Sequence, residues 1–243
     1  MPNASIRILF IHHSVGRYLI RDGELRRRLL PLRADDRPLV LWDHDCNQRG
    51  LHDGEGRPLE QAFPVPGDDT DPPGLLNLFA GEDEDARLAR RQALNFEVVM
   101  LKSCYPNSAI RSNTELARTK DVYRRLLTTL ADHRDNQFLL LTSPPLVPLR
   151  TNRGQSRRAR RLSTWLARRV DLPPNVAVFD LFDRLAIPER AGARADRLRK
   201  RYRRRLPTDS HPNIRAGDEL ALDLVDAIVG AAARSRRTVR PDV

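Results

Sequence analysis

Apolar residues along the chain fall into five short runs, separated by stretches in which they recur at helical spacing. The runs span residues 6–11, 38–42, 96–101, 137–142 and 175–181. Their length and their content of β-branched and other apolar residues are typical of buried strands. Strands that alternate with helices in this way predict an α/β fold with a parallel sheet covered on both faces.

Helices are expected between these strands. The pattern predicts them from Gly16 to about Leu30 with a break at Asp22-Gly23, and over about 75–79, 84–94, 155–169, 194–204 and 216–233. Another begins after Ser112, which has capping-box spacing to Glu115. The whole set predicts a three-layer, doubly wound, five-stranded parallel sheet of the flavodoxin-like type, with the strands in the order 2-1-3-4-5.

Polar clusters follow four of the five strands, at residues 12–14, 43–47, 102–107 and 142–143. Open parallel sheets bind ligands outside the carboxyl ends of their strands. We therefore expect these clusters to gather along one edge of the sheet. Residues 48–74 are rich in Gly, Pro and Asp, and a loop of this length is usually functional or disordered.

Length and charge add two expectations. The 243 residues suit a single domain, 1–243, in which we expect 235–243 to be a disordered tail. The formal net charge is +11, and all but three of the 43 basic residues are arginines. Because these arginines are spread over most helices without interleaved aromatic residues, they favour solvated helix faces over a nucleic-acid partner. The densest run, Arg197 to Arg205, leaves a polyanion-binding surface open as an alternative.

The remaining composition bears on location. Two cysteines, Cys46 and Cys104, are too few for a disulfide framework or a thiolate metal site. The first residues lack the charged and apolar segments of a secretory signal. No apolar stretch approaches the ~20 residues that span a bilayer. We expect a cytoplasmic protein with no membrane span.

Residues suited to acyl transfer occur at both ends of the chain. That chemistry needs a nucleophile, a base, a group that orients the base, and donors for the oxyanion. Ser14 follows the first strand and is a candidate nucleophile, and His211 is a candidate base with Asp209 as its orienting acid. Asn107 and the backbone N–H of Ser14 are candidate oxyanion donors.

The order Ser, Asn, Asp-His resembles that of the SGNH hydrolases, the GDSL-type esterases and lipases. Three stretches carry the resemblance: Phe-Ile-His-His-Ser-Val-Gly, Val-Val-Met-Leu-Lys-Ser-Cys-Tyr-Pro-Asn-Ser and Asp-Ser-His-Pro-Asn. The chain is most similar to a divergent bacterial branch with an "HHS" block and a "KSCxPNS" block. The resemblance implies an SGNH fold and a cofactor-free and metal-free serine esterase acting on a small-molecule or carbohydrate ester, such as an O-acyl group.

The resemblance also suggests further site residues. Gly74, with Gly50 as its rival, stands for the family's second oxyanion glycine, and His13, Lys102 and Ser103 are expected to bind substrate. The chain departs from the family pattern at His13, which replaces the Asp of Gly-Asp-Ser. It also departs in the acid, which precedes the histidine by two residues instead of three.

Two other functions stay open on the sequence alone. A metal-dependent hydrolase could draw on six candidate ligands: His12, His13, Asp43, His44, Asp45 and His211. A non-catalytic module on the same scaffold could bind an anionic polymer through Arg197 to Arg205.

Overall fold

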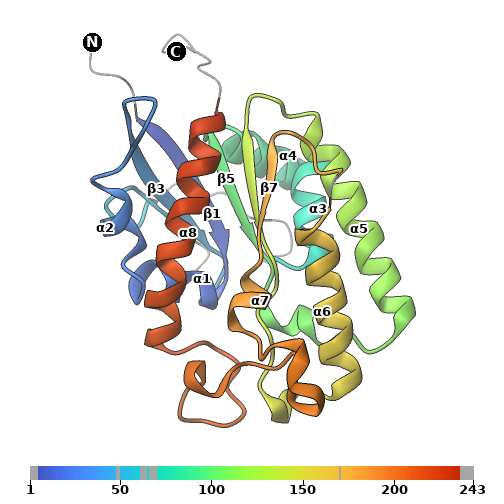
Figure 1. Cartoon of the computed structure of the whole chain (residues 1–243). Helices are drawn as coiled ribbons and strands as arrows, with labels where there is room; N and C mark the ends of the chain where they lie inside the picture. Colours follow the sequence, from blue (N-terminus) through green and yellow to red (C-terminus); the bar gives the residue numbers. More distant parts are fainter. Residues whose placement is uncertain (1–4, 48–49, 61–64, 66–69, 170, 236–243) are drawn as a thin grey trace.

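A computed structural model describes residues 5–47, 50–60, 65, 70–169 and 171–235 of the chain. It has an α/β fold built on one seven-stranded sheet, in the order β2-β3-β1-β5-β6-β7, with β4 paired to β3 (Figure 1). The strands are β1 (Ile6–His12), β2 (Arg33–Ala34), β3 (Arg37–Asp45), β4 (Gly50–His52), β5 (Val98–Lys102), β6 (Gln137–Leu141) and β7 (Val176–Phe179).

Five strands, β3-β1-β5-β6-β7, pair in parallel, in the order predicted for the five apolar runs. The prediction of a five-stranded sheet is wrong, because β2 and β4 pair antiparallel with β3. Strand β3 is also longer than its apolar run. Its polar residues Asp43, His44 and Asp45 pair with β4 and thereby continue the strand.

Helices connect these strands. They are α1 (Ser14–Arg21), α2 (Leu25–Leu29), α3 (Pro72–Ala80), α4 (Glu84–Ala93), α5 (Asn113–Ala131), α6 (Arg153–Ala167), α7 (Leu181–Leu185) and α8 (Ile214–Arg234). Four short 3₁₀ helices complete the set of described helical segments: η2 (Tyr105–Ser108), η3 (Pro148–Arg150), η4 (Glu189–Arg194) and η5 (Lys200–Tyr202).

The helix predicted over 194–204 is wrong, since only η4 and η5 form near it. Asp196 has a left-handed backbone, with φ 65°, which interrupts a right-handed helix. Leu198 forms an isolated bridge with Ala186, which requires extended backbone. The other predicted helices form, including the break near Gly23 between α1 and α2.

Both faces of the sheet are covered by helices, which gives three layers (Figure 1). The period of two in β1 explains how one strand serves both sides. Ile6, Ile8 and Phe10 join a core with α1, α2 and α8, whereas Leu9 and Ile11 join a core with helices α3 to α6.

Ser235, predicted to begin a disordered tail, is buried and donates its hydroxyl to the carbonyl of Ala232 at 2.7 Å. Residues 236–243 of that predicted tail lie outside the described residues. Within the described ranges, no helix is both long and apolar enough to cross a membrane.

Candidate active site

Ser14 lies at the junction of β1 and α1. Strand β1 ends at His12, His13 is the extended N-cap, and Ser14 is the first helical residue, half-buried at the carboxyl end of the strand. The junction is tight, because a Cβ on Gly16 would lie 2.3 Å from the Cβ of His12. Glycine at this position is thus required for the first turn of α1 to approach β1 so closely.

His211 reaches Ser14 from a loop near the other end of the chain. The Ser14 hydroxyl lies 2.8 Å from Nε2 of His211, which is a hydrogen-bonding distance. The loop is held on both sides of the histidine. Buried Ser210 accepts a hydrogen bond from the backbone N–H of Val147 at 3.2 Å, and Asn213 caps α8.

Asp209 fixes the tautomer of His211. Its Oδ1 accepts from Nδ1 of the ring at 2.6 Å and from the backbone N–H of His211 at 2.9 Å. Burial raises the pKa of Asp209, but these two hydrogen bonds and the nearby positive charges outweigh it, so the pKa is lowered. With an ionised acceptor at Nδ1, the hydrogen of the neutral ring resides there. Nε2 then presents its lone pair to the Ser14 hydroxyl.

Two tyrosines bracket the His211 ring. The rings of Tyr18 and Tyr105 meet it edge-on, with centroid distances of 5.5 Å and 5.0 Å. The guanidinium of Arg204 lies over the ring of Tyr18, 4.0 Å from its centroid. These residues were not predicted. The available signal was that Tyr18 lies one helical turn after Ser14 and therefore shares its face of α1.

Asn107 lies in η2, two residues from Tyr105, so the predicted Asn segment does reach the site region. Asn107 also lines a small cavity that includes Tyr123, Ser143 and Phe182. In the described part of the chain, no hydrogen bond joins its side chain to Ser14 or His211. Its assignment as an oxyanion donor stays a prediction.

The assignment of Gly74 as an oxyanion donor is wrong. Its N–H donates to Oδ1 of Asp71 at 2.6 Å, because Asp71 is the N-cap of α3 and Gly74 occupies the third position of that helix. The rival, Gly50, is paired with Asp45 in the β3–β4 ladder. The sequence pattern missed both local roles.

The structure also corrects two of the three predicted substrate-binding residues. Lys102 and Ser103 are completely buried. The ammonium of Lys102 donates to the carbonyl of Ser103 at 3.0 Å, and burial lowers its pKa. The Ser103 hydroxyl donates to the carbonyl of Thr70 at 3.0 Å. Neither side chain is at a surface that a substrate can reach. His13 is half-buried beside Ser14, and its role in binding substrate stays a prediction.

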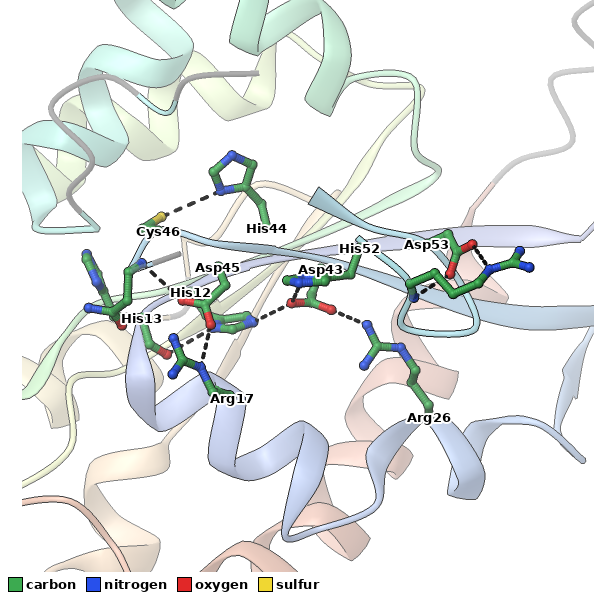
Figure 2. A network of polar contacts seen from close by, with 12 residues as sticks. His12, His13, Arg17, Arg26, Asp43, His44, Asp45, Cys46, His52 and Asp53 are labelled. Atoms are coloured by element: carbon green, nitrogen blue, oxygen red, sulfur yellow. Dashed lines mark hydrogen bonds and ion pairs between the residues drawn. The ribbon is translucent and has the colours of Figure 1, made fainter. Parts of the chain in front are cut away.

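The residues proposed as metal ligands are engaged elsewhere (Figure 2). His12 bonds Asp43 at 3.0 Å, and Asp45 bonds Arg17 at 2.6 Å. His44 points to the other side of β3, toward Cys46. Over the described ranges, no three His, Cys, Asp or Glu side chains are grouped so that they could hold a metal ion.

The basic run from Arg197 to Arg205 fastens its own loop. Arg199, Arg203 and Arg204 each donate Nε to a backbone carbonyl, those of Ala186, Leu198 and Pro212. Arg201 bonds Glu219 of α8 at 3.3 Å. These contacts give the arginines a structural role next to the His211 loop.

No protein-family model matches the chain, and no curated protein sequence matches it.

Proposed function

We propose that this protein is a serine hydrolase of the SGNH type that cleaves an ester by acyl transfer. One observation carries the proposal: the unbroken contact series from Ser14 Oγ to His211 Nε2 at 2.8 Å and from His211 Nδ1 to Asp209 Oδ1 at 2.6 Å. A hydroxyl, an imidazole and a carboxylate in this order form the arrangement that activates serine as a nucleophile. The resemblance of the three sequence stretches to SGNH hydrolases points the same way.

The reaction has two halves. Ser14 Oγ attacks the ester carbonyl while its proton moves to Nε2 of His211. The imidazolium, stabilised by Asp209, then gives that proton to the leaving alcohol, and an acyl group remains on Ser14. In the second half a water molecule attacks the acyl group, with His211 again taking the proton. Free Ser14 and a carboxylic acid result.

The tetrahedral intermediate carries a negative charge on the former carbonyl oxygen. The backbone N–H of Ser14 is the first of α1, and the first N–H groups of a helix lack intrahelical acceptors. It therefore serves as an oxyanion donor, aided by the positive end of the helix dipole. Asn107 is the candidate for a second donor. The substrate class is a small-molecule or carbohydrate ester, the chemistry requires no cofactor, and the cytoplasm is the expected location.

Labelling with a fluorophosphonate probe tests the proposal, because the probe reacts only with an activated serine. We expect the wild type to be labelled and Ser14→Ala to remain unlabelled. Ser112→Ala is the matched control. Ser112 caps α5 with an exposed side chain, so its loss costs about 1 kcal/mol of stability and leaves labelling intact.

Treatment with a chelator addresses the metal-dependent alternative. A serine hydrolase keeps its full labelling and ester turnover after dialysis against EDTA. Labelling that persists in Ser14→Ala, or turnover that needs added divalent metal, would show that the proposed function is wrong.

A further inference from the structure

A second histidine, His12, lies directly behind the Ser14 turn and is fully buried. Its Nδ1 lies 2.9 Å from the backbone carbonyl oxygen of His13, and its Nε2 lies 3.0 Å from Oδ2 of Asp43 (Figure 2). A carbonyl oxygen and an ionised carboxylate only accept hydrogen bonds. Both contacts are therefore satisfied only when each ring nitrogen carries a hydrogen, which makes His12 an imidazolium.

The Asp43 carboxylate is the counter-charge for the His12 imidazolium. It accepts from His12, from Nδ1 of His52 at 3.1 Å, and from the guanidinium of Arg26 (Figure 2). Burial raises the pKa of Asp43, but the bond from His12 and the surrounding positive charges outweigh burial and lower it. The buried carboxylate is thus ionised and can hold a cationic ring beside it.

The other nitrogen of His12 acts on the backbone. The carbonyl of His13 also accepts from the N–H groups of Gly16 at 2.8 Å and Arg17 at 3.4 Å, so it begins the hydrogen bonds of α1. That carbonyl and the N–H of Ser14 belong to one planar peptide group, and the described chain contains no cis peptide bond. An atom that fixes the direction of the carbonyl therefore fixes the opposite direction of the Ser14 N–H.

We propose that His12 is a positioning residue for Ser14: protonated on both ring nitrogens and anchored by Asp43, it holds the His13 carbonyl and thereby aims the Ser14 N–H at the oxyanion. We call the His12 ring, the Asp43 carboxylate and the His13 carbonyl the His12 clamp. The inference rests on the proposed function, since it concerns the oxyanion of that reaction. A hydrogen bond to a peptide carbonyl also polarises the N–H of the same peptide, which strengthens it as a donor.

Two substitutions separate the two ends of the clamp. His12→Asn keeps an amide near the position of Nδ1 and loses the bond to Asp43. His12→Gln keeps an amide near the position of Nε2 and loses the bond to the His13 carbonyl. Because the oxyanion develops in the transition state, we expect His12→Gln to lower kcat about 10- to 100-fold with KM changed less than about 3-fold. His12→Asn should restore kcat to within about 5-fold of the wild type.

His133→Asn is the matched control. It changes a histidine that is only half-buried and that lies just before β6, at the end of the sheet opposite Ser14, against the ring of Phe79. We expect its kcat to equal that of the wild type. Equal losses in His12→Asn and His12→Gln, in proportion to lost thermal stability, would overturn the positioning role and leave a merely structural one.

The charge on His12 is tested without any substrate. Nitrogen-15 NMR of protein labelled at histidine, with the His12 signals identified by their loss in His12→Gln, should show both ring nitrogens protonated at pH 7. A single unprotonated ring nitrogen would overturn the proposal even in an active enzyme. An inactive wild type in which both nitrogens are protonated would instead overturn the proposed function and support the clamp geometry.

Discussion

The protein contains two His–Asp pairs that use the same chemical groups for different ends. In His211–Asp209 the side chains are 22% and 23% exposed, and the second ring nitrogen faces a hydroxyl, which can donate. In His12–Asp43 they are 0% and 6% exposed, and the second ring nitrogen faces a carbonyl, which cannot. The first ring keeps a lone pair and can act as a base. The second has none to offer.

The comparison shows that the partner of the second nitrogen decides what a His–Asp pair does. Burial reinforces the difference. His211 is reached from solvent and flanked by two tyrosine rings, whereas His12 is enclosed by β1, β3 and the first turn of α1. A titrating base needs access to a proton donor or acceptor, and a fixed cation needs only a permanent counter-charge.

The largest expected effect comes from breaking the His211–Asp209 pair. Asp209→Asn should lower kcat/KM by up to about 10⁴-fold, because the amide favours the wrong tautomer of His211. Ser14→Ala should cost at least as much, and the double variant should cost little more than the worse single one, since the residues act as a unit. Turnover of a short-chain aryl ester measures all three. Losses that simply multiply would show that Ser14 and Asp209 act independently.

A smaller effect, on stability, is expected from breaking the His12–Asp43 pair. Asp43→Asn leaves His12 and Arg26 without their ionised partner, and we expect it to lower the free energy of unfolding by about 3 kcal/mol at pH 7. The folded-state pKa of Asp43 is lowered from 3.8, so its stabilising contribution is present above that value and is lost as the pH falls below it. The difference between wild type and Asp43→Asn should therefore shrink below about pH 4.

Urea unfolding at pH 7, 5, 4 and 3 measures that difference. Arg27→Gln serves as a control, because its ion pair with Glu24 is exposed and is worth less than about 1 kcal/mol at any pH. A difference between wild type and Asp43→Asn that stays constant down to pH 3 would contradict the ionised state of Asp43.

The smallest expected effect comes from removing the tyrosine rings that contact His211. Tyr105→Leu and Tyr18→Leu each remove one edge-on ring contact with His211, and such contacts contribute about 0.5–1.5 kcal/mol. We expect kcat/KM to fall a few-fold, up to about 10-fold, in each variant. Tyr123→Phe, which changes a buried tyrosine bonded to Ser103, should leave kcat/KM unchanged. Unaltered turnover in both leucine variants would remove the tyrosines from the site.

Much of the parallel sheet could be predicted from sequence, because its strands bury both faces and therefore appear as apolar runs. The start of α5 could also be predicted from the sequence. Ser112 accepts from the N–H of Glu115 at 3.0 Å, as its spacing predicts. Strands β2 and β4 were missed because they are short and pair at an edge, where few residues need to be apolar.

Site residues could be predicted where their position in the sequence suggests a role. They were missed where their surroundings depend on packing between distant parts of the chain. Ser14 follows a strand and Asp209 is two residues from His211, so both assignments follow from position in the chain. The burial of Lys102 depends on β5 extending one residue further into the sheet than its apolar run indicates. The partnership of His12 with Asp43 depends on the register of β1 against β3, which no local pattern specifies.

Ser14 and His211 are 197 positions apart, and the base is held only once the loop before α8 is in place. A nascent chain therefore contains Ser14 long before His211 has been synthesised. Helix α8 completes the core that β1 begins, through residues such as Leu220 and Leu224. Transient detachment of this one helix would release the loop that holds His211 while most of the sheet stayed intact, so the proposed activity would depend on α8 being in place.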